Sequence, residues 1–389
     1  MSTAARPADP IAAVTHPDPY PYYADLVASR PIHRDDALDV WVACSAAAVT
    51  AVLTEPACLV RPPAEPVPRA IVGREAGSIF GRLVRMSDGA KHAALKPAVS
   101  AATASIEKLV GREAERWAEQ LVVELDPMDD AARVNELAFR VSVYVLASLL
   151  GVPPDMLAGT AAIVGEFVRG IAPTATSEHL ARGNAAAELL GSFRARLGAA
   201  DSHAPMLEAL DREVARAGGA DREDVVANGI GFLSQAYEAT AGLIGNTLVT
   251  LGRQDGVRAA VAADPNRLAA VVREVVRYDP PIQNTRRFLV RDAVVAGQAM
   301  KAGETVLVVL AAANRDPLAN PEPSRFDALR SVRQSFTFGA GPHACPGESI
   351  ATAIATAAVN RLLAAGVKPE RLAERLTYRA SANTRVPVF

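Results

Sequence analysis

Cys345 is the residue of this sequence with the clearest potential for chemistry, because it lies in a glycine-rich segment just before a predicted helix. The segment 338–347 reads Phe-Gly-Ala-Gly-Pro-His-Ala-Cys-Pro-Gly, and a helical pattern over 348–365 follows it. Pro346 suits the first turn of a helix, so we expect the sulfur at the helix N-terminus, where free N–H groups and the helix dipole favour a thiolate. Taken alone, the segment could also be a phosphate-binding loop or a simple connection, and the cysteine an inert core residue.

The whole segment resembles the heme-binding signature of the cytochrome P450 family, F-G-x-G-x-H-x-C-x-G, and matches it at every specified position. The resemblance implies that Cys345 is the metal ligand, the axial thiolate of a non-covalently held heme b (iron protoporphyrin IX). Electron donation from such a thiolate helps to cleave the O–O bond of bound oxygen. Phe338 is expected to shield the sulfur from water, and Gly339 and Gly347 to let backbone N–H groups turn toward it.

Heme carries two propionates, which need cationic or hydrogen-bonding partners when they are buried. The resemblance assigns four such partners: His92, Lys96, Arg287 and His343. Lys96 replaces the usual arginine and keeps the charge but not the bidentate fork. Arg286 competes with Arg287, which we prefer because the family pattern leaves one residue between a threonine and this arginine. The alternative for His92 is an ordinary histidine on a helix surface.

Glu274 and Arg277 form an E-x-x-R pair, which places both side chains on one face of a predicted helix. By itself such a pair is most often a solvated surface contact. Its position before two prolines resembles the order of segments in P450s. The resemblance implies a structural role, in which Glu274 and Arg277 pair with an arginine of the segment before the cysteine, for which Arg330 is the match.

The predicted central helix departs from its family at the residue that usually guides protons. The usual motif is A-G-x-[D/E]-T-T, and in this register Glu238 keeps the acid, Ala239 replaces the first threonine and Thr240 stands in the second, less involved position. The resemblance therefore implies that the alcohol for proton delivery is missing. Its loss is expected to favour release of peroxide without product.

Gln235 could compensate for the missing hydroxyl, because it lies four residues before Ala239 on the same helical face. It also replaces the small residue that lies close to the iron in the family. We hypothesise that its amide points over the heme, with Glu238 as a proton relay. The alternative is that Gln235 turns away and bonds to the backbone, while water alone supplies protons.

Most of the chain from about Ala101 to Tyr278 is predicted to be helical, with interruptions at Pro127, at residues 151–154 and at Gly218-Gly219. The stretch from Asp221 to about Leu251 is long and mostly apolar. Acidic and amide side chains interrupt it, so it indicates a buried central helix and not a membrane span.

After Pro280 and Pro281 the pattern changes to strands at residues 288–290 and 305–310, with a turn at 301–303. The fold class is therefore mainly α, and the resemblance, which runs from about Asp18 to the C-terminus, implies the P450 fold: a large helical region with a small β-sheet region. We expect residues 1–389 to form one domain, without a fused reductase or ferredoxin domain.

The bulk properties exclude several other classes of protein. The 41 basic and 43 acidic side chains are mixed along the chain and give a formal charge of −2, so no nucleic acid or anionic membrane is expected as a partner. Three cysteines are too few for a disulfide framework and form no zinc pattern. The first thirty residues lack the apolar stretch of a signal peptide or membrane anchor, so a cytoplasmic protein is expected.

The resemblance implies an oxidoreductase, a monooxygenase that inserts one oxygen atom from O2 into a small organic substrate. Electrons are expected from NAD(P)H through a separate ferredoxin or flavodoxin with its reductase. A second possibility, motivated by Ala239, is a P450 that uses peroxide or works without a redox partner, as a dehydratase or isomerase. A third is a heme protein that binds gas without catalysis, which the retained Glu238 argues against. The substrate, the regiochemistry and the oligomeric state are not predicted.

Overall fold

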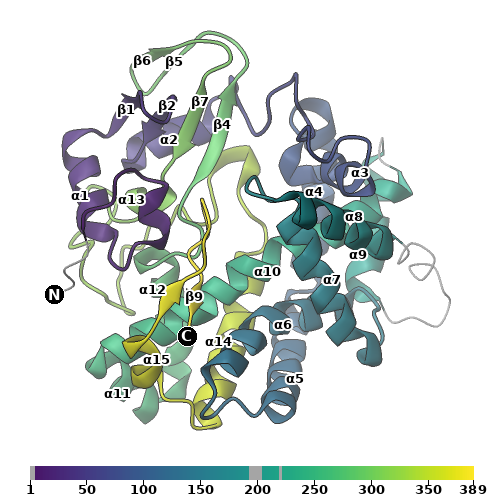
Figure 1. Ribbon diagram of the computed structural model, residues 1–389, viewed down its shortest axis with the longest axis vertical. Helices are drawn as coiled ribbons and strands as arrows, with labels where there is room; N and C mark the ends of the chain where they lie inside the picture. The colour runs from purple at the N-terminus through teal and green to yellow at the C-terminus, as the bar shows by residue number, and fades with distance from the viewer. Residues whose placement is uncertain (1–4, 192–203, 219–220) are drawn as a thin grey trace.

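The computed structural model describes residues 5–191, 204–218 and 221–389 (Figure 1). Its helices are α1 (Tyr20–Ser29), α2 (Ala46–Thr54), α3 (Glu75–Arg82), α4 (Gly89–Ser105), α5 (Glu107–Leu125), α6 (Ala131–Leu149), α7 (Leu157–Gly170), α8 (Ser177–Gly191), α9 (Pro205–Ala217), α10 (Arg222–Arg253), α11 (Asp255–Ala263), α12 (Leu268–Tyr278), α13 (Leu310–Ala313), α14 (Glu348–Ala364) and α15 (Pro369–Glu374). Its strands are β1 (Ile32–Asp35), β2 (Val40–Ala43), β3 (Cys58–Leu59), β4 (Thr285–Leu289), β5 (Ala293–Val295), β6 (Gln298–Met300), β7 (Thr305–Val308), β8 (Thr377–Tyr378) and β9 (Pro387–Val388). Short 3-10 turns include η1 (Ala12–Thr15), η2 (Val84–Met86) and η6 (Gly341–His343).

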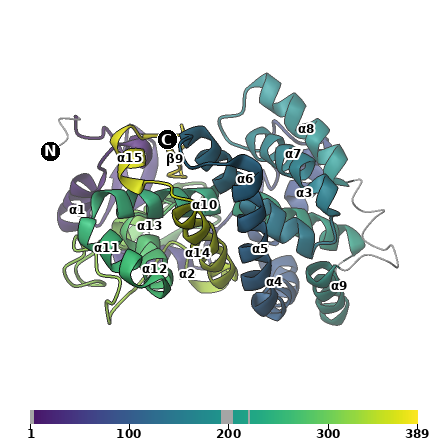
Figure 2. The same ribbon diagram turned by 90° about the horizontal axis from the view of Figure 1, so that it is seen from below.

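Helix α10 is the central element of the helical region. It begins with a capping box in which the side chains of Asp221 and Asp224 accept hydrogen bonds from each other's backbone N–H. It packs against α6, α14 and α15, and Figures 1 and 2 both show it beside α6 and α14. Because most of its residues are buried, the apolar sequence of α10 is explained by packing from several sides, as a central helix requires.

The predicted helical region is confirmed, including its interruptions. Pro127 lies between α5 and α6, and residues 151–154 lie between α6 and α7. Helix α9 ends before Gly218, whose φ of 68° is a backbone conformation that glycine adopts at little cost. Gly219 lies outside the described residues.

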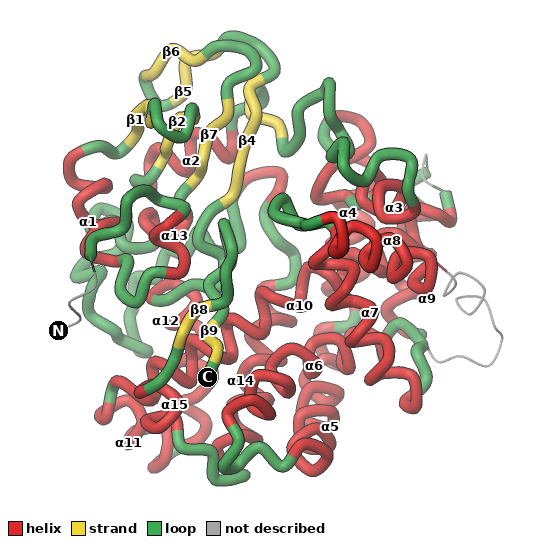
Figure 3. Tube along the Cα trace, in the orientation of Figure 1, coloured by secondary structure: helices red, strands yellow, loops and turns green. Residues whose placement is uncertain are grey.

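The larger sheet has the strand order β1-β2-β7-β4-β3 and gathers at one side of the molecule (Figure 3). Strand β4 pairs antiparallel with β7 through the register Arg287↔Val306. The predicted strands are shifted relative to those observed. β4 starts at Thr285, before the predicted 288, and β7 ends at Val308 because Leu310 already begins the buried helix α13. Tertiary burial overrides the strand propensity of this apolar run. The turn at 301–303 is confirmed, with Gly303 at a φ of 87°.

The hydrophobic core extends through the helical region and beneath the larger sheet. The main cluster joins the inner faces of α4 to α12 with α14, and a second cluster packs α2 against β4 and β7. Within the described ranges, none of the helices has both the length and the apolar character needed to cross a lipid bilayer.

Candidate active site

The loop that carries Cys345 is held by its own backbone. The N–H of Cys345 donates to the carbonyl of Phe338 at 2.7 Å, and the N–H of Gly347 donates to the Cys345 sulfur at 3.4 Å. Gly339 and Gly341 have φ angles of 71° and 67°, which residues with side chains adopt only with strain. The loop therefore folds back on itself and turns a backbone donor toward the sulfur.

Helix α14 begins at Glu348, where the predicted helical pattern starts. Pro346 was expected in the first helical turn, but Pro346 and Gly347 form a turn between the cysteine and the helix. The physical reason is that Gly347 points its N–H at the sulfur. The end of α14 agrees with the prediction, since Gly366 follows it with a φ of 87°.

We infer that the sulfur of Cys345 lies in a hollow of the surface, because Cys345 is accessible although protein atoms surround it. The residue is accessible to solvent. Burial by the surrounding protein nevertheless raises the pKa of its thiol, and the Gly347 N–H and the Lys96 ammonium oppose this shift. A residue that is accessible and yet surrounded by protein atoms is typical of a concave binding site. Within such a hollow, donors and cations directed at the sulfur favour the thiolate form that binds metals.

Four basic side chains gather beside this hollow from three parts of the chain. The rings of His92 and His343 lie 4.1 Å apart, and His343 Nε2 contacts Asp88 Oδ1 at 2.9 Å. The Lys96 ammonium donates to the carbonyl of Ala344, next to the cysteine. Helix α4 supplies His92 and Lys96, and the cysteine loop supplies His343. Strand β4 supplies the fourth side chain, Arg287, whose charge acts on Asp88.

His92 and Arg287 are buried without a matching acid. His92 Nε2 has no hydrogen-bond partner among the described residues, and burial, with His343 and Lys96 nearby, lowers the pKa of His92 to about 4. Arg287 is only 6 % exposed, and its guanidinium donates a hydrogen bond to the carbonyl of Arg286. Arg286 itself is exposed. Unpaired buried donors of this kind fit the two carboxylates of a heme.

The central helix opens onto free space over a short stretch. Gln235 is exposed and residues 236–239 are half-exposed, although both flanks of α10 are buried. The Gln235 side-chain amide donates to the carbonyl of Gly231 at 2.8 Å, which is the backbone-bonded alternative left open by the sequence. Its carbonyl oxygen remains free to accept a hydrogen bond. Whether it does so above a bound heme remains a prediction.

Glu238 faces the C-terminal strands. Its carboxylate lies 3.6 Å from the Arg379 guanidinium and accepts a long hydrogen bond, 3.4 Å, from the Thr384 hydroxyl. The Thr240 hydroxyl is buried and has no partner among the described residues. The side chains that could handle protons on α10 therefore point in different directions, and no hydroxyl stands at Ala239.

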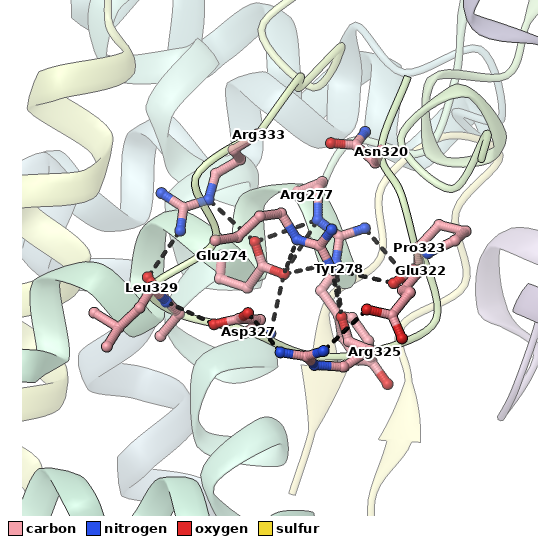
Figure 4. Close-up of polar contacts among 12 residues, drawn as sticks. Glu274, Arg277, Tyr278, Asn320, Glu322, Pro323, Arg325, Asp327, Leu329 and Arg333 are labelled. Atoms are coloured by element: carbon pink, nitrogen blue, oxygen red, sulfur yellow. Dashed lines mark hydrogen bonds and ion pairs between the residues drawn. The ribbon is translucent and has the colours of Figure 1, made fainter. Parts of the chain in front are cut away.

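Glu274 is the centre of a buried charge cluster (Figure 4). It pairs with Arg277 at 2.6 Å and with the predicted Arg330 at 3.4 Å, so the implied structural pairing is confirmed. Sequence reasoning missed Arg333, which lies 3.1 Å from Glu274. Its spacing of three residues from Arg330 was the available signal.

Two polar residues that follow the paired prolines, Gln283 and Asn284, bind to the backbone. Gln283 donates to the carbonyl of Pro280, and Asn284 donates to the carbonyl of Ala382. Both side chains are buried. They brace the connection from α12 to β4, which is the local role that amides commonly have after prolines.

Known proteins resemble this chain over much of its length. Residues 227–365 match the family model described as Cytochrome P450. The monooxygenase PikC of Streptomyces venezuelae is 31% identical over 360 residues, which cover 89% of this chain and 83% of PikC. The vitamin D(3) 25-hydroxylase of Pseudonocardia autotrophica is 31% identical over 238 residues, 59% of this chain and 57% of the relative. The chain therefore belongs to the cytochrome P450 family of oxidoreductases.

Solved structures confirm the predicted P450 fold. The crystal structure of CalO2 aligns with a TM-score of 0.80 and 26% identity, covering 99% of this chain and 97% of CalO2. P450BioI, solved in complex with a hexadecenoic-acid-ligated acyl carrier protein, aligns with a TM-score of 0.77 and 23% identity, covering 95% of this chain and 97% of that one. At this identity the second match supports the fold alone.

Proposed function

We propose that this protein is a heme-thiolate monooxygenase that inserts one oxygen atom from O2 into a small organic substrate. The observation that carries the proposal is the Cys345 sulfur, which accepts the Gly347 N–H beside a group of basic side chains, of which the buried His92 has no hydrogen-bond partner at Nε2 among the described residues. Electrons would come from NAD(P)H through a separate ferredoxin or flavodoxin with its reductase.

Different residues of the hollow would bind the iron and the propionates of heme b. Cys345 would be the iron ligand, and His92, Lys96, Arg287 and His343 would hold the propionates. When bound, the heme supplies activation of oxygen, which no side chain can perform. Lys96 already bridges to the carbonyl of Ala344, so its contact with a propionate also fixes the cysteine loop.

Phe338, Gly339 and Gly347 would protect and tune the thiolate. Phe338 is half-buried and packs against the main hydrophobic core, which keeps water from one side of the loop. The positive φ of Gly339 lets the chain turn back so that Phe338 accepts the Cys345 N–H. Backbone donors to a ligating sulfur lower its electron donation and thereby set the properties of the metal.

Protons for the reaction would be moved by Glu238, with Gln235 and Thr240 as neighbouring hydrogen-bonding groups on α10. Glu238 is held by Arg379 and Thr384, so it has to exchange these partners in order to deliver a proton toward the hollow. Gln235 can accept a hydrogen bond from water through its free carbonyl oxygen. Each of these steps uses side chains that lie on or next to the exposed stretch of α10.

A second candidate function is a P450 that uses peroxide or needs no redox partner. Ala239 favours it, because the chain has no hydroxyl at the position where a proton-delivering alcohol is usual. Under this alternative the same hollow binds heme and substrate, and the source of oxidising equivalents differs.

Spectroscopy followed by turnover tests the proposal. The reduced, heme-loaded protein with carbon monoxide is expected to show the red-shifted band of thiolate ligation, and Cys345→Ser is expected to lose it. Product formed with a ferredoxin system and NADPH supports the monooxygenase. Product formed with hydrogen peroxide alone supports the second candidate. A wild-type CO complex without the thiolate band contradicts both.

A further inference from the structure

The segment from Leu83 to Asp88 forms a wall between α10 and the cysteine loop. At one end, the N–H of Val84 donates to Asn228 Oδ1 of α10 at 2.9 Å. At the other end, Asp88 Oδ1 contacts His343 at 2.9 Å. The turn η2 lies between these two anchors, so its side chains are positioned by both the central helix and the site of the thiolate.

This wall adjoins the exposed stretch of α10. A Cβ placed on Gly231 would meet Leu83 Cδ2 at 2.9 Å and Gln235 Nε2 at 3.1 Å, so Leu83 and Gln235 approach the same point. Gln235 is exposed in the middle of α10, at the start of the half-exposed residues 236–239. The space that Gln235 faces, which we call the chamber, is therefore bordered by η2.

Arg85 lies in the middle of η2 and has no counter-charge. Its Nε is buried without a hydrogen-bond partner, and it forms no salt bridge with any residue that the structure describes. Burial alone lowers the pKa of Arg85 to about 10, which means that no nearby carboxylate offsets the loss of hydration. The residue as a whole is only partly buried, so part of the Arg85 side chain is covered and part remains accessible.

Neighbouring arginines are paired, which makes Arg85 an exception along this segment. Arg82 contacts Asp221 at 2.8 Å and Asp224 at 3.2 Å. Arg61 lies 3.5 Å from Glu65. Removing a guanidinium from water without a nearby acid costs free energy. In this protein Arg85 carries that cost next to the chamber.

We propose that Arg85 binds a carboxylate of the substrate, so that the substrates of this enzyme are organic acids. The inference rests on the proposed function and adds the substrate class to it. The planar guanidinium fork matches a carboxylate in a bidentate geometry. An acid held at η2 is fixed relative to α10, because Val84 is hydrogen-bonded to Asn228.

A heme propionate is the other possible source of a carboxylate. Four basic side chains already stand beside the Cys345 hollow for the two propionates, and two of them, His92 and Arg287, lack acid partners. Arg85 comes two residues after Leu83, whose side chain approaches the same point of α10 as Gln235. This placement favours the substrate, and the experiment below separates the two sources.

The test compares acids with their uncharged amides. Heme-loaded protein is titrated by calorimetry and by the change in heme absorption with decanoate and decanamide, phenylacetate and phenylacetamide, and cinnamate and cinnamide. At least one acid is expected to bind the wild type ten or more times as tightly as its amide. Arg85→Met is expected to abolish this preference and Arg85→Lys to keep part of it. The matched control Arg82→Met, at the end of α3 just before this segment, is expected to keep all of it.

Two further measurements exclude a role toward the cofactor. Arg85→Met removes an unpaired buried charge, so the ligand-free holoprotein is expected to melt at a higher temperature and to transfer heme to apomyoglobin at an unchanged rate. A lower melting temperature with faster heme transfer assigns the carboxylate to the propionates and overturns the inference. A panel in which no acid binds the wild type more tightly than its amide overturns it as well.

The two proposals fail in different ways. An acid preference that depends on Arg85, in protein whose reduced CO complex lacks the thiolate band, supports the anion site and contradicts the monooxygenase. A normal thiolate band without an acid preference contradicts the anion site alone.

Discussion

The hydroxyl that α10 lacks at Ala239 can be restored by a single substitution. Ala239→Thr is expected to lower the peroxide released per NAD(P)H by about tenfold, because a positioned proton donor typically contributes roughly 100-fold or more to its step. Product and peroxide are measured together in ferredoxin-driven turnover. Ala239→Val has the shape of threonine without the hydroxyl and is the control. Equal partitioning in the threonine and valine variants would show that the hydroxyl is not limiting here.

Gln235 allows a prediction that depends on its observed bond. Because its amide nitrogen donates to the carbonyl of Gly231, its carbonyl oxygen is the atom left to hold water in the chamber. Gln235→Ala is expected to shift the resting heme spectrum toward the high-spin form and to increase peroxide release several-fold. The spectrum and the product yield per NAD(P)H are the measurements. An unchanged spectrum and yield would mean that Gln235 serves only the helix backbone.

At the scale of elements, two glycines set the distance between α7 and α8. A Cβ on Gly183 would lie 2.5 Å from the Cα of Gly170, so the helices touch through backbone. Gly183→Ala is expected to push them apart and to reduce the free energy of unfolding by about 1–3 kcal/mol. The pocket between α7, α8 and α10, which Glu166 and Tyr237 line, should widen. Denaturant unfolding and substrate titration check both effects.

Gly159 provides the matched control on α7, because a Cβ there meets nothing within 4 Å. Gly159→Ala is expected to leave stability unchanged or to raise it by up to about 1 kcal/mol, through a less flexible unfolded chain. If both alanine variants lowered stability equally, the close contact of α7 and α8 would not be the cause.

The Glu274 cluster is expected to be the most sensitive polar contact between α12 and the segment before the cysteine. Glu274→Ala leaves three arginines without their shared acid in a buried position, so about 3–5 kcal/mol of stability should be lost. The urea midpoint and the fraction of heme incorporated are the measurements. Glu322→Ala, in an exposed pair with Arg325, is the control and should change neither.

How much could be predicted depended on whether the information was local. The Cys345 loop and the central helix were recognisable because motif spacing and apolar patterning lie within a few turns of chain. Pro346 lies outside the first turn of α14, against expectation, because the contact of Gly347 with the sulfur outweighs the preference of Pro346 for a helix. Arg333 was missed because its partner Glu274 lies far away in sequence. No motif contains Arg85, and its buried Nε without a partner can be recognised only in the structure.

At the scale of the whole molecule, the hollow is where separate parts of the chain meet. The cysteine loop comes from the C-terminal part, Lys96 from α4 and Arg287 from β4 of the larger sheet. A single buried arginine ties the chain ends to the same core: Arg385 pairs with Asp279 at 2.9 Å and donates to the carbonyl of Val14. The helical and sheet regions are therefore joined by polar contacts as well as by apolar packing.

Removal of heme should therefore weaken the whole molecule and not the loop alone. A ligand at a thousandfold excess over its Kd stabilises the folded state by about 4 kcal/mol. At roughly 2 °C per kcal/mol for a domain of this size, the melting temperature of the apoprotein should fall by roughly 8 °C or more. Calorimetry of apoprotein, holoprotein and reconstituted protein measures the difference.

The residues that hold the propionates make this last prediction specific. His92 Nε2 is buried without a partner among the described residues, so a heme carboxylate is expected to satisfy it. His92→Leu should then lower the melting temperature of the holoprotein, because the propionate loses a donor. In the apoprotein the same change removes an unsatisfied polar atom and should be neutral or stabilising. The sign of the effect is thus expected to reverse between the two forms. A loss of stability of the same size in both forms would assign His92 to packing and leave the propionate to Arg287 and its neighbours.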